Sequence, residues 1–192
     1  MPLRRVEGDP REMSDEALVA ACAVDETAAL GALFDRHSGA VYRFVARLAG
    51  AGDGELDDLV QLTFLEAWKS SARYACRGSA RSWLFGIAAN VVRHHVRGEA
   101  RRRAAMRGLA EVPPGRTRRP DDEVAHSELV GRLAVALPAL PLDLRVAFVL
   151  CDLEQVSGVD AARLLGVREG TMWRRLHEAR KRLRRSLEGG PR

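Results

Sequence analysis

Residues 158–187 read GVDAARLLGVREGTMWRRLHEARKRLRRSL, and this stretch decides the fold class of the second half of the chain. A short segment, 158–165, and a long segment, 169–187, are separated by the turn Gly166-Val167. The long segment carries an apolar stripe at helical spacing, made of Met172, Leu176, Ala179, Leu183 and Leu187. Its opposite side is basic, with Arg174, His177, Lys181, Arg184 and Arg185. A short helix, a glycine turn and a helix with a basic outer face predict a helix-turn-helix that enters a DNA major groove.

The distribution of charge also favours a polyanionic partner. The chain has 192 residues, with 31 Lys and Arg against 26 Asp and Glu and a net charge of +5. The basic excess is concentrated between residues 168 and 185 and, in a shorter tract, between residues 93 and 103. Two basic tracts on one chain predict two contacts with a polyanion. The alternative for either tract is an ordinary solvated helix face, and for the second half it is a helical hairpin without DNA.

The composition excludes several classes of protein. Apolar residues make up 46% and charged residues 30%, so a core can form and global disorder is excluded. Aromatic residues are only 5%, which favours an all-α fold over a β-sandwich. No uninterrupted apolar stretch approaches the ~20 residues of a membrane span. The N-terminus lacks the apolar region of a secretory signal, and the three cysteines form no C-x-x-C pattern, so we expect a protein of the reducing cytoplasm.

The sequence contains no catalytic or metal-binding motif that we recognise. A P-loop, an H-E-x-x-H helix and a Cys/His metal spacing are all missing from it. We therefore expect neither an enzyme nor a bound cofactor or metal.

In the first half, residues 55–71 give the strongest helical periodicity. One side of this helix is an apolar stripe that predicts a core face: Leu56, Leu59, Val60, Thr63, Phe64, Ala67 and Trp68. The roughly opposite side holds Asp58, Gln61, Leu62, Leu65 and Lys69. Two leucines among polar residues favour a contact with another macromolecule. The alternative is that they pack on the N-terminal helices. We expect Asp25 to cap one of these, with Leu30, Leu33 and Phe34 as its apolar positions.

A helix capped by Ser79 and ending near Arg97 is predicted next, with Trp83, Leu84, Ile87, Ala88 and Val91 on its apolar side. The loop before it contains Tyr74, Arg77 and Gly78, and Asn90 and Arg93 lie partly off the apolar side. An aromatic ring, a cation and an amide are the groups that hold an unstacked base. The alternatives are that Trp83 belongs to the core and that Tyr74 only closes the loop.

A segment rich in proline and arginine divides the chain. Residues 107–124 include Pro113, Pro114 and Pro120 with several arginines and little apolar periodicity. Proline and glycine at this density block a helix or strand. We therefore predict two small helical domains, 1–106 and 125–192, which a flexible linker holds apart.

Four stretches of the sequence resemble the extracytoplasmic-function (ECF) sigma factors, the smallest group of the sigma-70 family. They are DLVQLTFLEAW at 58–68, GSARSWLFGIAAN at 78–90, ALPALP at 136–141 and LLGVREGTMWRRL at 164–176. The resemblance implies a sigma region 2-like domain, the linker and a region 4-like domain, which together join core RNA polymerase to promoter DNA. An anti-sigma protein that masks the polymerase-binding residues is a further partner that the resemblance implies.

The resemblance also implies a role for individual residues. Those that would grip the coiled coil of the largest polymerase subunit are Asp58, Gln61, Leu62 and Leu65. Those that would capture a flipped base of the minus-ten element are Tyr74, Arg77, Ser79, Ala80, Trp83, Asn90, Arg93 and Arg97. Those that would read the minus-thirty-five element are Arg168, Thr171, Trp173, Arg174, Arg175, His177 and Lys181.

The sequence departs from the family pattern in several places. Leu62 stands where the polymerase-binding motif usually has Glu, and Glu178 stands where a basic residue is frequent. The turn before the recognition helix usually reads like Ser-Tyr-x-Glu-Ile-Ala, and here Gly158 follows Ser157. Trp173 and Arg174 stand where a basic and a small residue are common. These departures bear on which promoter is read. The alternative function is a helix-turn-helix regulator that binds DNA without core polymerase.

Overall fold

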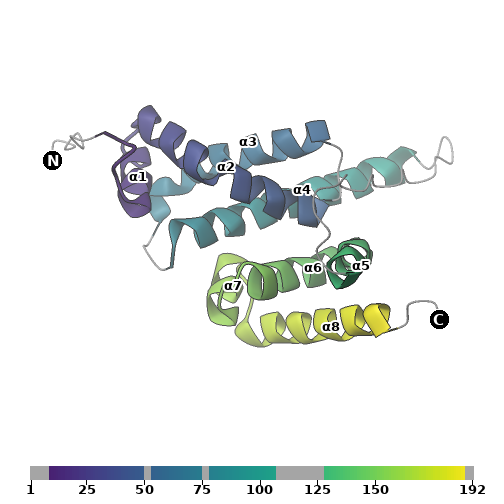
Figure 1. Cartoon of the computed structure of the whole chain (residues 1–192). Coiled ribbons are helices and arrows are strands. Elements are labelled where there is room, and N and C mark those ends of the chain that lie inside the picture. The colour runs from purple at the N-terminus through teal and green to yellow at the C-terminus, as the bar shows by residue number, and fades with distance from the viewer. Residues whose placement is uncertain (1–8, 50–52, 75–77, 107–127, 189–192) are drawn as a thin grey trace.

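The computed structural model describes residues 9–49, 53–74, 78–106 and 128–188, and every regular element within these ranges is helical. The predicted linker and Arg77 lie outside the described residues. Four α-helices form a first bundle and four more form a second (Figure 1). The all-α fold class with a helix-turn-helix in the second half is confirmed.

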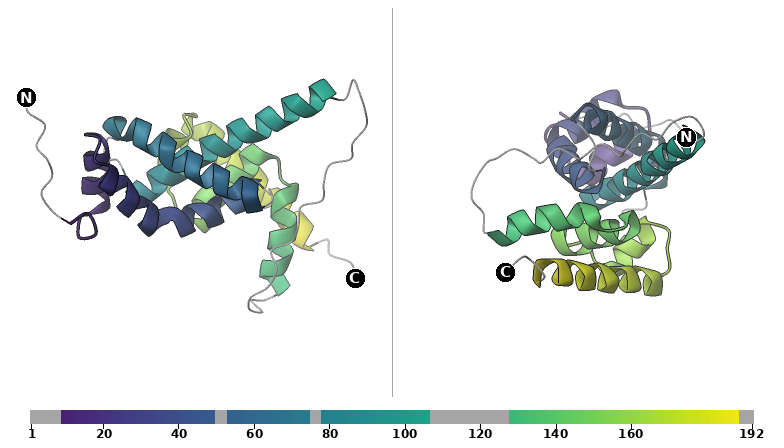
Figure 2. Two further views of the ribbon diagram at one scale, coloured as in Figure 1. Left: turned by 90° about the horizontal axis from the view of Figure 1, so that it is seen from above. Right: turned by 90° about the vertical axis from the view of Figure 1, so that its right-hand side faces the viewer.

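The first bundle consists of α1 (Asp15–Cys22), α2 (Thr27–Ala49), α3 (Asp53–Ser70) and α4 (Ala80–Met106), with a short 3-10 turn η1 (Ser71–Arg73). Helices α2, α3 and α4 pack on one another around a core that includes Phe44, Leu48, Phe64 and Phe85. The rings of Phe44 and Phe85 stack with their centroids 4.6 Å apart. Helix α4 continues beyond the predicted end near Arg97, and its C-terminal turns project past the bundle (Figure 2).

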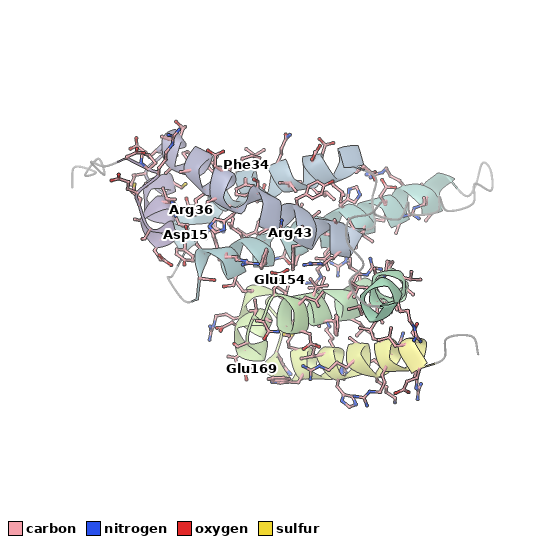
Figure 3. The ribbon with its side chains drawn as sticks, in the orientation of Figure 1. Asp15, Phe34, Arg36, Arg43, Glu154 and Glu169 are labelled. Carbon is pink, nitrogen blue, oxygen red and sulfur yellow. The ribbon has the colours of Figure 1, made fainter. Side chains whose placement is uncertain are left out.

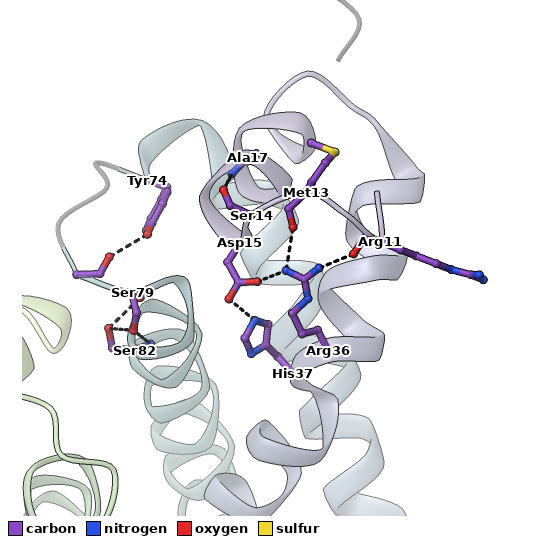
Figure 4. Close-up of polar contacts among 11 residues, drawn as sticks. Arg11, Met13, Ser14, Asp15, Ala17, Arg36, His37, Tyr74, Ser79 and Ser82 are labelled. Atoms are coloured by element: carbon purple, nitrogen blue, oxygen red, sulfur yellow. Dashed lines mark hydrogen bonds and ion pairs between the residues drawn. The ribbon is translucent and has the colours of Figure 1, made fainter. Parts of the chain in front are cut away.

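The turn between α1 and α2 differs from the prediction. Asp25 does not cap α2 but adopts a left-handed conformation with φ 62°, two residues before the helix begins. Asp tolerates this conformation better than most residues, and the chain needs it to reverse direction here. The link between the two helices is made instead by Asp15, whose carboxylate bonds to the buried His37 at 2.7 Å and to Arg36 (Figure 4).

The pKa of Asp15 reflects this cluster. Burial of the carboxyl raises its pKa, but the hydrogen bonds and charges of Arg36 and His37 outweigh burial and hold the pKa below its usual value. The ionised form of Asp15 therefore stabilises the packing of α1 on α2.

The second bundle consists of α5 (Glu128–Ala136), η2 (Leu137–Ala139), α6 (Leu142–Phe148), η3 (Val149–Leu153), α7 (Gly158–Leu164) and α8 (Glu169–Glu188). Helix α6 continues into η3 as a π-helical turn. The Ser157 hydroxyl caps α7 by accepting from the Asp160 N–H at 3.1 Å. Gly166, with φ +63°, then makes the turn into α8. The apolar side of α8 is buried against α6 and α7 through Met172, Leu176, Ala179 and Leu183.

The expectation that the linker holds the two halves apart differs from the structure, in which the bundles lie against each other (Figures 1 and 2). Helix α2 contacts α6, η2 and η3, and α4 contacts α7. Gly86 faces Leu164 so closely that an added Cβ would lie 3.0 Å from the Leu164 Cβ. Arg145 donates a hydrogen bond to the Leu48 carbonyl at 2.6 Å across the interface. The composition of a linker cannot reveal such complementary surfaces.

Candidate functional site

The outer face of α3 is exposed, as predicted. The residues of its apolar stripe are buried from Leu56 to Ala67, whereas Leu62 and Leu65 are 42% and 51% exposed. Asp58 and Gln61 are exposed on the same side. Both leucines therefore keep a large exposed area, although Leu65 also lines a groove whose other wall is α2.

A groove of about 340 Å³ runs between α2 and α3 beside these leucines. Its lining is largely apolar and consists of Leu30, Gly31, Phe34, Asp35, Gln61, Phe64 and Leu65. Phe34 is 38% exposed, and its ring centroid lies 4.9 Å from that of the buried Phe64. Figure 3 shows Phe34 on the part of the first bundle that is remote from the second bundle. The groove can hold an amphipathic helix, which inserts apolar side chains at helical spacing.

The periodicity of α2 predicted Phe34 as a core residue, whereas its side chain is partly exposed in the structure. The buried residues of α2 follow the series Leu33, His37, Val41, Phe44, Val45 and Leu48. Leu30 and Phe34 lie one turn apart and beside that series. This offset is the signal in the sequence that could have indicated a second apolar face.

The loop before α4 is held by its own side chains. The Tyr74 hydroxyl donates to the Gly78 carbonyl at 3.0 Å (Figure 4). The Tyr74 ring centroid lies 5.0 Å from that of the half-buried Trp83. The Ser79 hydroxyl caps α4 by accepting from the Ser82 N–H at 3.2 Å, as predicted. Ala80 is completely buried, so the expectation that it contacts DNA is not compatible with this structure. As the first residue of α4 it packs against the core.

The polar residues of α4 that were predicted to contact DNA differ in how far they are exposed. Asn90 is half-buried and Arg97 is exposed. The Arg93 side chain is only 13% exposed and pairs with Asp143 of α6, at 3.0 Å. Arg93 therefore faces the second bundle in this structure instead of solvent.

The outer face of α8 carries most of the predicted DNA-binding residues. The exposed residues are Arg168, which directly precedes the helix, Trp173, Arg174, His177 and Lys181, and Thr171 is half-buried. Within the part of the chain that the structure describes, no acidic side chain pairs with Arg174, Lys181 or Arg184. These cations are free to bind phosphate or base edges.

Arg175 is the exception on α8. Its side chain is 18% exposed and pairs with Asp143 at 2.8 Å. The same carboxylate pairs with Arg93, so Asp143 joins an arginine of α4 to an arginine of α8. Neither pairing was predicted, because Asp143 carries no distinguishing sequence pattern.

Glu154 makes the second charged link between the bundles. Its side chain is only 6% exposed and accepts hydrogen bonds from Arg47 at 2.7 Å and Arg81 at 2.8 Å. Figure 3 shows Glu154 between the two bundles. Two arginines neutralise this carboxylate, which compensates its loss of water.

Two further findings limit the chemistry of the described residues. No group of three or more His, Cys, Asp or Glu within the described ranges could hold a metal ion. Among the helices that the structure describes, none has the length and apolarity that a membrane crossing requires.

Comparisons with known proteins agree with this arrangement. Residues 33–102 match the family model "Sigma-70 region 2", and residues 131–183 match "Sigma-70, region 4". The ECF RNA polymerase sigma factor SigM of Mycobacterium tuberculosis is 32% identical over 181 residues, which cover 94% of this chain and 88% of SigM. SigE of Mycolicibacterium smegmatis is 35% identical over 155 residues, and the match spans 79% of this chain but 59% of SigE.

Among solved structures, the chain is similar to the sigma factor RpoE from Bartonella quintana, solved in complex with the anti-sigma factor NepR. The identity is 25%, and the match covers 82% of this chain and 96% of RpoE with a TM-score of 0.63.

Proposed function

Because the chain belongs to the ECF sigma factors of the sigma-70 family, we propose that it joins core RNA polymerase to promoter DNA through three separate surfaces. In this proposal residues 1–106 form the region 2-like domain, 107–124 the linker and 125–192 the region 4-like domain. Its place of action is the cytoplasm, where polymerase and promoter meet. The exposed apolar face of α3 beside the groove is the observation that carries the proposal.

The polymerase-binding surface consists of the outer face of α3 and the groove. Leu62 and Leu65 supply apolar area, and Asp58 and Gln61 supply hydrogen-bonding groups around it. A helix of the coiled coil in the largest polymerase subunit is the occupant we propose. The groove extends this surface onto α2, where Phe34 adds an aromatic contact.

The minus-ten surface consists of the loop before α4 and the exposed side of α4. Tyr74 and Trp83 form an aromatic pair on which an unstacked base can lie, and Ser79 and Asn90 lie about one turn before and two turns after Trp83. Arg97 is available for phosphate, and Arg77 belongs to the proposed set but lies outside the described residues. Flipping a base costs a few kcal/mol of stacking, which these contacts must offset.

The minus-thirty-five surface consists of the outer face of α8. The N-terminal residues Thr171, Trp173 and Arg174 would meet base edges, and Arg168, His177 and Lys181 would meet phosphates or flanking bases. Arg93 and Arg175 both pair with Asp143 in the docked arrangement. Contact of these two arginines with DNA therefore requires that phosphate replace Asp143.

An anti-sigma protein is the further partner we propose. A structural neighbour of 25% identity was solved with an anti-sigma factor, which supports such a partner here. A protein that covers Leu62 and Leu65 would block polymerase binding without any chemical step. Reconstitution with the product of a neighbouring gene tests this, and unaltered transcription counts against that product as the inhibitor.

A test of the proposed function must separate it from a helix-turn-helix regulator that acts alone. Immobilised core polymerase should retain the wild-type chain, and the chain alone should bind duplex promoter DNA weakly. A chain that core polymerase does not retain, and that binds a specific duplex by itself, is a regulator of the second kind.

A further inference from the structure

Trp173 is an unusual residue for the outer face of α8. It lies in the second turn of the helix, is 50% exposed and is directly followed by two arginines. An exposed indole leaves a large apolar area in water, which costs free energy in the isolated chain. A binding partner that covers the ring would recover this free energy.

Gly158 sets the position of this ring. A Cβ added to Gly158 would lie 2.6 Å from Cζ2 and 2.8 Å from Cη2 of Trp173, distances that real Cβ atoms do not show. The ring therefore lies directly on the backbone at the start of α7, and only glycine permits this approach. Because the φ angle of Gly158 is not positive, the backbone itself would accept alanine, so the contact with Trp173 is what requires glycine.

The chain segment that supports the ring carries a second exposed apolar side chain. Val159 follows Gly158 in α7 and is 39% exposed. Arg174, which directly follows Trp173, is exposed and carries no ion pair among the described residues, and the exposed Glu169 lies one turn before Trp173. An exposed apolar ring with a free arginine next to it in sequence is compatible with the major groove, where base edges lie between phosphates.

The thymine C5-methyl is the apolar group that a major groove displays. On the basis of the proposed function, we propose that Trp173, positioned by Gly158, reads a thymine methyl group in the upstream promoter element. Trp173 is then a specificity-determining residue and Gly158 its positioning residue. A tryptophan side chain cannot donate two hydrogen bonds to a guanine, as arginine does. The chain would therefore prefer thymine at this base step.

Replacement of thymine by deoxyuridine tests this on the unmodified protein, because it removes only the methyl group. A promoter is first obtained by in vitro selection with the holoenzyme of core polymerase and wild-type chain. Each upstream thymine is then replaced in turn, and promoter affinity is measured. We expect one position to lose about fourfold in affinity, the value of one buried methyl-sized group. If no position responds, the proposal is overturned.

Three variants assign the effect to these residues. Trp173→Ala holoenzyme should lose the sensitivity to deoxyuridine at that position, and Gly158→Ala should reduce it because the new Cβ displaces the ring. Gly131→Ala in α5 is the matched control, because an added Cβ there has no neighbour within 4 Å among the described residues. Full sensitivity in Trp173→Ala would overturn the proposal. If the selection returns no promoter that the wild-type holoenzyme binds, the proposed function itself is refuted, which is a separate result.

Discussion

The substitution Leu65→Ala should weaken binding to core polymerase without unfolding the chain. Full burial of a leucine side chain is worth about 1.5–3 kcal/mol, and Leu65 is 51% exposed, so about half of that value is available to a partner. We therefore expect a loss of about 1 kcal/mol, or about fivefold in the dissociation constant. Since Leu62 is 42% exposed on the same face, the double variant should lose about 2 kcal/mol, or about 30-fold.

The assay is the equilibrium binding of the full chain to immobilised core polymerase, followed by interferometry. Val135→Ala is the matched control, because Val135 is 67% exposed but lies on α5, outside the groove. It should leave the dissociation constant unchanged. Circular dichroism of each variant confirms that it is folded. If Leu65→Ala and Val135→Ala bind core polymerase equally well, the assignment of the polymerase surface to α3 is refuted.

The remaining predictions concern the interface, the pH dependence and the recognition helix. Glu154→Gln should destabilise the docking of the two bundles by about 1–2 kcal/mol. This loss is smaller than that for a fully buried ion pair, because Arg47 and Arg81 are half-exposed. An unchanged radius of gyration in X-ray scattering would contradict the prediction. Asp15, whose pKa is held below its usual value, stabilises the fold above the unfolded-state pKa of about 3.9 and loses this effect as the pH falls through the lower folded value. The urea midpoint of the wild-type chain should thus exceed that of Asp15→Asn at pH 7, and the two midpoints should converge below about pH 4. If the difference between the midpoints does not change with pH, the ionised Asp15 carboxylate is not the source of the stabilisation. Arg174→Ala should change which upstream promoter sequence is preferred, whereas Arg184→Ala should lower the affinity for all promoter sequences equally. Competition binding with promoter variants measures both effects. If Arg174→Ala leaves the preference unchanged, the register assigned to α8 is wrong.

The sequence predicted those parts of the fold in which one helix face is buried and the other is solvated. In α3, Leu56 and Phe64 are buried while Leu62 and Leu65 are exposed, as the helical period requires. In α8, Met172 is buried and Arg174 is exposed, for the same reason. A single buried face produces a clear period, so such helices can be read without tertiary information.

Helix α4 could not be read in this way, because it is buried on more than one side. Phe85, Ala89 and Val92 lie off the predicted apolar stripe and are nevertheless buried. Gly86 faces Leu164 of the second bundle. A helix that packs against both bundles has no single apolar period, so its second contact is visible only in the structure.

The charged residues between the bundles were missed for a different reason. Glu154 follows a π-helical turn and Asp143 lies in the first turn of α6, and their partners are far away in sequence. Periodicity carries no information about such long-range pairs. The same is true of Gly158, whose importance follows from its distance to Trp173 and not from the local sequence.

The most direct test of the central claim, that this chain bridges core polymerase and promoter DNA, is transcription with purified components. Core polymerase and the wild-type chain are mixed with a set of selected promoters, and the transcripts are measured. We predict specific initiation only when both proteins are present, and a strong reduction when Leu62 and Leu65 are both replaced by alanine. Transcription that does not depend on the chain, or that does not change in the double variant, would contradict the account.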